Sequence, residues 1–212
     1  MMNPDPWLTR TLLLLFVTLF IPAGATAQRS GSPITIEQIF EAIGAREGST
    51  VCEIGAGDGG LSIAAARIVG EQGRIYTNEL GDARVKTLRE RIAASGLAQI
   101  TVVAGDANST NFPDGVCDAM FMRDVYHHFR DPAAMNASIR AALAPGARVA
   151  ILDFAPPPGN EAPCAADRAT DGMHGVGRDT LARELKEAGL EPAAAEDTGQ
   201  RWFMIVAEKP KR

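Results

Sequence analysis

Residues 51–61 read VCEIGAGDGGL, a short apolar strand that ends in an acid and runs directly into a glycine-rich turn. Glycine lacks a Cβ atom, so the backbone at Gly55, Gly57 and Gly60 can turn sharply and approach a ligand closely. Apolar residues then recur at the spacing of one helix face up to Gly70, which is placed to end the helix. A strand, a glycine turn and a helix in this order predict the first half of a mononucleotide-binding unit.

The glycine pattern alone leaves two interpretations open, because a dinucleotide fingerprint and a tight turn without a ligand both contain such glycines. Glu53 stands two positions before the first glycine. The resulting Glu-x-Gly-x-Gly resembles the first motif of class I S-adenosylmethionine-dependent methyltransferases.

Later segments agree with this resemblance in their order. The apolar run 73–79 ends in Glu79, 26 residues after Glu53, near the interval of about 20 residues that separates a glycine turn from an acid for the ribose hydroxyls. Gly105-Asp106-Ala107 follows the third predicted strand, 100–103, and resembles the segment whose acid and backbone amide meet the adenine.

The fourth predicted strand, 117–122, leads into the run RDVYHHFRDP at 123–132. A strand followed by His-His-Phe-x-Asp-Pro is frequent in small-molecule methyltransferases. The Asn/Asp-Pro-Pro-Tyr run typical of nucleobase and glutamine methylation is absent from this position of the sequence. The fifth predicted strand ends in Asp153 and Phe154, which we expect at the mouth of the sheet, and the Pro- and Gly-rich loop 155–176 is placed to act as a lid.

The predicted fold is α/β, a Rossmann-like doubly wound sheet of seven strands, mostly parallel with an antiparallel last strand. Thr35-Ile-Glu-Gln38 predicts a capping box at the start of a first helix. Residues 193–197 and 202–207 predict a hairpin at the end of the chain.

The resemblance implies S-adenosyl-L-methionine as cofactor and assigns it the side chains and turn residues that match the family's motifs. These cofactor-binding residues are Glu53, Gly55, Ala56, Gly57, Glu79, Leu80, Asp106, Ala107 and Arg123. Candidates for catalysis, above all for accepting a proton, are Asp124, His127, His128 and His174. For the two adjacent histidines, packing within the loop is an equally good interpretation, and two neighbouring histidines alone are a poor metal clamp, so no metal is predicted.

Residues 1–27 predict a signal peptide: a short region up to Arg10, an apolar run too short for a membrane span of about 20 residues, and Ala25-Thr-Ala27 before the cleavage point. We then expect residues 28–212 to form one methyltransferase domain in the periplasm or outside the cell. The protein would contact the membrane only if the leader stays uncleaved.

Charge and cysteine usage limit the partners. The formal net charge is −5 and the one basic run is the short tail 209–212, which argues against nucleic acid and favours a small-molecule substrate. Cys52 and Cys117 lie in apolar runs and are predicted as buried thiols, whereas Cys164 lies in a loop and is expected to be exposed.

Two other functions compete with methyl transfer. An NAD(P)-dependent oxidoreductase would share the glycines, but the Tyr-x-x-x-Lys pair of short-chain dehydrogenases is missing, since Tyr126 is followed four positions later by Arg130. A secreted module that binds S-adenosylmethionine without turnover would also keep Glu53, Glu79 and Asp106.

Overall fold

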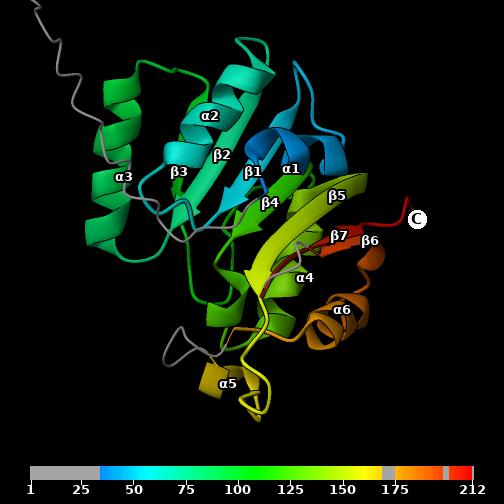
Figure 1. Cartoon of the computed structure of the whole chain (residues 1–212). Coiled ribbons are helices and arrows are strands. Elements are labelled where there is room, and N and C mark those ends of the chain that lie inside the picture. The colour runs from blue at the N-terminus through cyan, green and yellow to red at the C-terminus, as the bar shows by residue number, and fades with distance from the viewer. Residues whose placement is uncertain (1–33, 169–174, 198–200, 212) are drawn as a thin grey trace, which may run out of the picture. The chain divides into compact units, whose positions relative to one another are not determined.

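The computed structural model describes residues 34–168, 175–197 and 201–211. Within these residues one sheet has the strand order β3-β2-β1-β4-β5-β7-β6 (Figure 1). The strands are β1 (Thr50–Ile54), β2 (Arg74–Glu79), β3 (Ile100–Ala104), β4 (Cys117–Arg123), β5 (Leu143–Phe154), β6 (Glu191–Asp197) and β7 (Trp202–Glu208). Strands β1 to β5 pair in parallel, and β7 is antiparallel to both β5 and β6. This arrangement confirms the predicted fold class and the final hairpin.

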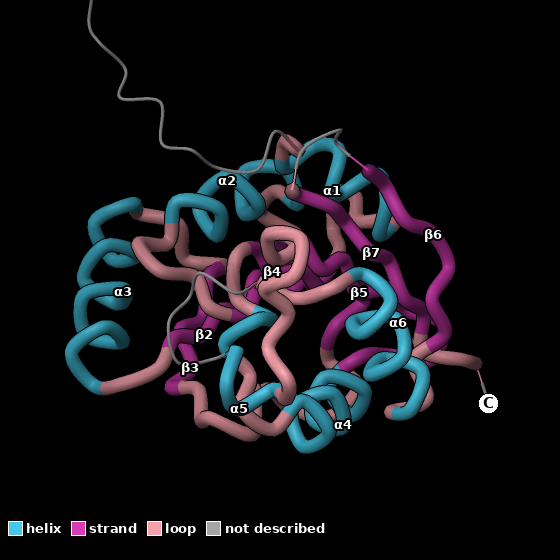
Figure 2. The backbone as a smooth tube through the Cα atoms, turned by 60° about the horizontal axis from the view of Figure 1, so that its bottom comes forward, coloured by secondary structure: helices cyan, strands magenta, loops and turns pink. Residues whose placement is uncertain are grey.

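Helices cover both faces of the sheet (Figure 2). They are α1 (Ile36–Ile43), α2 (Gly60–Val69), α3 (Asp82–Ser95), α4 (Pro132–Ala142), the short α5 (Ala165–Arg168) and α6 (Arg178–Glu187), with a 3-10 turn η1 (Tyr126–His128) after β4. Helices α1, α2 and α3 pack in one apolar cluster, and α4 and α6 pack in the other, which is the doubly wound arrangement.

The strands alternate between these two clusters along their length. In β1, Val51 packs with α1 and α2 while Cys52 packs with α4 and α6. Both side chains are fully buried, because a parallel sheet between two helical layers has no face open to water. Because β1 to β5 are parallel, their carboxyl ends meet at one edge of the sheet, and the predicted site residues lie at that edge.

Local signals in the sequence fix the starts of α1 and α4, and the one at α1 is the predicted capping box. The Thr35 hydroxyl accepts the Gln38 N–H at 3.3 Å, and the Gln38 side chain accepts the Thr35 N–H at 2.8 Å. Asp131 caps α4 by accepting the Ala134 N–H at 3.0 Å. These bonds satisfy backbone donors that the first turn of a helix leaves unpaired.

The prediction that Cys52 and Cys117 are thiols is wrong, because the two residues form a disulfide with a Cα–Cα distance of 5.8 Å. Strands β1 and β4 are neighbours in the sheet, and both cysteines point into the cluster that contains α4 and α6. Cys164 is free and exposed, as predicted.

Two further predictions concern residues outside the described ranges. The leader 1–27 and His174 both lie there. Of the lid loop 155–176, the structure describes 155–168, which include α5, and 175–176. Among the described residues, no helix is both long and apolar enough to cross a membrane.

Candidate functional site

The glycine turn after β1 is held against the end of β2 by Asn78. The Asn78 side-chain oxygen accepts the Gly55 N–H at 3.0 Å, its backbone oxygen accepts the Ala56 N–H at 2.9 Å, and its amide nitrogen donates to the Thr110 carbonyl at 2.8 Å. Gly55 has a φ of 69°, and a Cβ atom there would lie 2.5 Å from a methyl group of Val125. The turn therefore needs glycine, and the loop after β4 packs directly on it.

Glu79 ends β2 and contacts this turn through one carboxylate oxygen. Oε2 accepts the Gly57 N–H at 2.8 Å and Oε1 accepts the Leu80 N–H at 2.8 Å. Arg84 lies 3.7 Å from Oε1. A carboxylate has about four lone-pair directions, so Glu79 keeps acceptor capacity toward a ligand. Leu80 beside it is a large apolar side chain with 46% exposure.

Glu53 is the penultimate residue of β1 and is buried, with 3% exposure. The Ser62 hydroxyl donates to Glu53 Oε2 and lies 2.9 Å from the Thr77 hydroxyl. Burial raises the pKa of Glu53 to about 7, against the opposing effects of the Ser62 hydrogen bond and the positive charge of Arg123. Near neutral pH this carboxyl group is thus poised between its two protonation states.

Asp106 and Ala107 follow β3 and are exposed. Asp106 Oδ1 accepts the Asn108 N–H at 3.0 Å, which orders the loop. Arg123, half-buried, is the last residue of β4. All nine cofactor-binding residues predicted from the sequence thus lie at the carboxyl ends of the adjacent strands β1 to β4.

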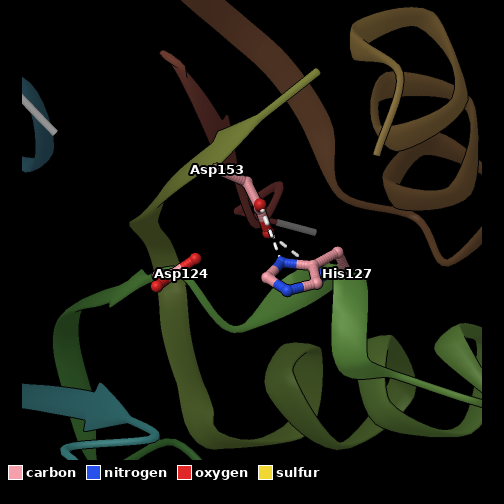
Figure 3. Close-up of side chains that lie close together, drawn as sticks. All are labelled: Asp124, His127 and Asp153. Atoms are coloured by element: carbon pink, nitrogen blue, oxygen red, sulfur yellow. Dashed lines mark hydrogen bonds and ion pairs between the residues drawn. The ribbon is translucent and has the colours of Figure 1, made fainter. Parts of the chain in front are cut away.

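A second group of side chains lies after β4 and β5 (Figure 3). His127 Nδ1 is 2.9 Å from Asp153 Oδ1, and the His127 backbone N–H donates to Asp153 Oδ2 at 3.0 Å. The Phe154 N–H also donates to Asp153 Oδ1 at 2.8 Å. His127 is 1% exposed and Asp153 fully buried, whereas Asp124 is exposed. One donor atom from each of Asp124, His127 and Asp153 lies within 4.8 Å of the others.

Of the predicted catalytic candidates, the structure brings Asp124 and His127 together, and His128 stacks on His127 with ring centroids 3.9 Å apart. Burial, followed by the nearby His127, lowers the pKa of His128. Asp153, expected at the mouth of the sheet, lies at the carboxyl end of β5 and is fully buried as the partner of His127. The sequence did not identify Asn78 as a site residue, because no local pattern distinguishes an Asn that forms hydrogen bonds with two loops.

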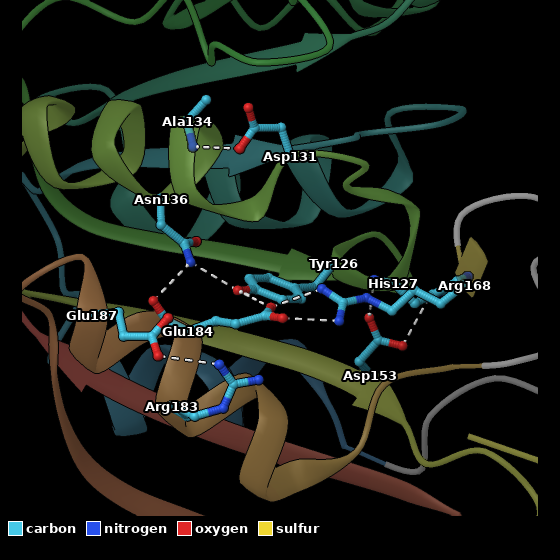
Figure 4. A network of polar contacts seen from close by, with 10 residues as sticks. All are labelled: Tyr126, His127, Asp131, Ala134, Asn136, Asp153, Arg168, Arg183, Glu184 and Glu187. Atoms are coloured by element: carbon cyan, nitrogen blue, oxygen red, sulfur yellow. Dashed lines mark hydrogen bonds and ion pairs between the residues drawn. The ribbon is translucent and has the colours of Figure 1, made fainter. Parts of the chain in front are cut away.

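A buried polar network connects the same loop to α4, α5 and α6 (Figure 4). Arg168 binds both carboxylate oxygens of Glu184, at 3.0 and 2.7 Å. The Tyr126 hydroxyl donates to Glu184 at 3.0 Å and lies 2.8 Å from the Asn136 amide nitrogen, which donates to it. Burial, together with the negative Glu184, holds the pKa of Tyr126 well above its usual range. The network fixes α5, in the middle of the predicted lid, against the residue next to His127.

Part of the chain matches a known protein family. Residues 51–146 match a family model described as "Methyltransferase domain". This segment runs from β1 into β5 and contains every predicted cofactor-binding residue as well as Asp124, His127 and His128.

Curated relatives cover the same part of the chain. The ubiquinone/menaquinone biosynthesis C-methyltransferase UbiE of Pseudomonas putida is 34% identical over 123 residues, which are 56% of this chain and 46% of the relative. UbiE of a Marinomonas strain is 29% identical over 115 residues, 54% of this chain and 46% of the relative. The chain therefore spans about half the length of the curated relatives it matches.

Solved structures share the fold at low sequence identity. A SAM-dependent methyltransferase from Aquifex aeolicus has a TM-score of 0.70 and 22% identity, covering 82% of this chain and 89% of that one. The [4+2]-cyclase SpnF has a TM-score of 0.72 and 17% identity, and the match covers 82% of this chain and 80% of SpnF. The described residues thus have the methyltransferase fold. Because SpnF, a cyclase, shares this fold, the fold alone does not determine the reaction.

Proposed function

We propose that this chain is an S-adenosylmethionine-dependent methyltransferase that transfers a methyl group to a small-molecule acceptor. The observation that carries the proposal is the position of Glu79. Its carboxylate is tied by the Gly57 N–H to the glycine turn, at the strand end where the resemblance puts an acid for the ribose hydroxyls. The match of residues 51–146 to a methyltransferase domain supports the same conclusion.

Each residue of this edge has a role that suits its chemistry. Glu79 accepts from the ribose hydroxyls, and Asp106 accepts from the exocyclic amine of the adenine. Leu80, exposed beside Glu79, offers apolar surface to the adenine face. Glu53, once ionised, complements the positive ammonium group of the methionine part, and the close backbone of Gly55 and Gly57 admits that part to the turn.

The sulfonium methyl group of the cofactor is already electrophilic. The chain therefore has to hold a nucleophile in line with it and keep water away. Val125, packed on Gly55, brings the loop after β4 next to the cofactor turn. When the acceptor carries a proton, Asp124 and His128 are the exposed side chains of that loop able to take it. His127 is turned toward Asp153 and buried, so its role is to position the loop.

A small-molecule acceptor is favoured over a nucleic acid by the net charge of −5, which repels a phosphate backbone. Incubation of the protein with S-adenosylmethionine labelled in its methyl group and a fractionated cell extract tests this. We expect label in the low-mass fraction with the wild-type protein and not with Glu79→Gln. Glu90→Gln, an exposed glutamate of α3, is the matched control. Label confined to protein or nucleic acid would refute a small-molecule acceptor, and no transfer in any fraction would refute the activity.

We further propose that the protein is exported and that residues 1–27 are removed. The apolar leader supports this, and so does the disulfide between Cys52 and Cys117, because such bonds persist in oxidising compartments. Fractionation of cells and N-terminal sequencing test the proposal. A periplasmic or secreted protein that begins at Gln28 would support it, and a cytosolic protein that retains Met1 would contradict it.

A further inference from the structure

We propose that Asp124, His127 and Asp153 bind one divalent transition-metal cation at the carboxyl ends of β4 and β5. Two of the three residues lie in the loop after β4, where Asp124 directly follows the strand and His127 lies in η1, and the third, Asp153, is the penultimate residue of β5. Their donor atoms converge within 4.8 Å (Figure 3). This binding is independent of the proposed methyl transfer, since it requires neither cofactor nor acceptor.

The spacing of His127 and Asp153 fits two ligands of one ion. Donors that each lie about 2.1 Å from a metal and subtend a right angle are about 3 Å apart. The observed distance between His127 Nδ1 and Asp153 Oδ1 is 2.9 Å. Backbone N–H groups of His127 and Phe154 already orient the Asp153 carboxylate. Such supporting hydrogen bonds hold metal ligands in their binding geometry.

Asp124 supplies the third ligand from the solvent side. It has a φ of 61°, a left-handed conformation that aspartate and asparagine tolerate better than most residues. Its side chain is exposed, and one of its carboxylate oxygens lies within 4.8 Å of the donor atoms of the other two residues. Three protein ligands leave coordination positions open, as in metal sites that bind a substrate or water.

The donor set also indicates which cations fit. An imidazole nitrogen with two carboxylates suits Mn²⁺, Zn²⁺ or Co²⁺ better than Ca²⁺ or Mg²⁺, which prefer oxygen ligands alone. With a neutral imidazole the two carboxylates carry two negative charges, and a divalent cation neutralises them. Without the cation, the Nδ1 proton of a neutral His127 is donated to Asp153. With the cation bound, that proton sits on Nε2 and Nδ1 is free to coordinate.

The test is a titration of the full-length protein, stripped of metal by a chelator, with Mn²⁺, with free Mn²⁺ measured by its electron paramagnetic resonance signal. We expect saturable binding of one ion per chain. Asp124→Asn, which keeps the size and tolerates the left-handed backbone, is expected to weaken binding at least tenfold. Asp114→Asn, an exposed aspartate in the turn before β4, should bind Mn²⁺ like the wild type.

Two results would overturn the proposal. One is the absence of saturable Mn²⁺ binding in the wild-type protein, and the other is equal binding by the wild type and Asp124→Asn. Circular dichroism of each variant establishes that it is folded. Binding of S-adenosylhomocysteine, measured on the same samples without metal, is a separate test of the methyltransferase assignment, so failure of one leaves the other intact.

Discussion

Loss of the disulfide between Cys52 and Cys117 is expected to destabilise the protein strongly. The two residues are 65 positions apart in the sequence. In the chain-entropy treatment, a closed loop of that length contributes about 4 kcal/mol to stability by restricting the unfolded chain. For a domain of 150–250 residues, about 2–4 °C of melting temperature correspond to each kcal/mol. Removal of the bond should therefore lower the melting temperature by roughly 10 °C.

Thermal unfolding followed by circular dichroism measures this effect. The wild-type protein is compared with the same protein reduced under denaturing conditions and refolded in reductant, which breaks the bond without substituting any residue. Cys164→Ser is the control, since that thiol is exposed and free. A titration of the denatured, unreduced protein should find one thiol. Three thiols, or equal melting temperatures with and without reductant, would refute the reasoning.

Three other predictions concern Glu53, Gly55 and Arg168. In the folded protein the pKa of Glu53 is about 7, above the ordinary value of 4.5. Between these pH values the folded protein holds a proton that the unfolded chain has lost. The free energy of unfolding therefore falls as pH rises through this range, by at most about 3 kcal/mol. Urea unfolding at several pH values tests this, and Glu53→Gln should flatten the slope; an equally steep slope in that variant would exclude Glu53 as the cause. Gly55→Ala should destabilise the protein by about 1–3 kcal/mol and abolish cofactor binding, because its Cβ would lie 2.5 Å from a Val125 methyl group. Calorimetry that finds wild-type affinity of this variant for the cofactor would contradict the tight packing of Val125 on the turn. Arg168→Ala leaves the partly buried Glu184 carboxylate without its ion pair, so limited proteolysis within 155–176 should become faster while cofactor affinity is kept. Unchanged cleavage would contradict the prediction that the ion pair holds this segment in place.

Features that depend on neighbouring residues could be predicted from the sequence. The capping box at Thr35 and the turn at Gly55 need only a few consecutive residues, and both are found where expected. The end of β2 at Glu79 was also predicted, since the apolar run stops at an acid, and β1 ends one residue after the predicted Glu53. Because carboxyl ends of parallel strands share one edge, this was enough to predict that the candidate cofactor-binding residues lie together.

Features that depend on how distant segments face one another could not be predicted. The disulfide needs β1 and β4 to be neighbours with both cysteines on the same face, and the apolar runs alone favoured thiols. The pairing of His127 with Asp153 joins residues 26 positions apart through the ends of two adjacent strands. The ion pair of Arg168 and Glu184 joins α5 to α6 and has no local signature in the sequence.

The most direct test of the methyltransferase assignment is the binding of S-adenosylhomocysteine, measured as a thermal shift and by calorimetry. A ligand at 100 times its Kd adds about 2.7 kcal/mol to the stability of the native state, which corresponds to a shift of about 5–10 °C for a domain of this size. We predict this shift with S-adenosylhomocysteine and S-adenosylmethionine, its loss in Glu79→Gln, its retention in Glu90→Gln, and none with NAD. A shift with NAD alone would contradict the account, as would a shift with S-adenosylhomocysteine that Glu79→Gln leaves unchanged.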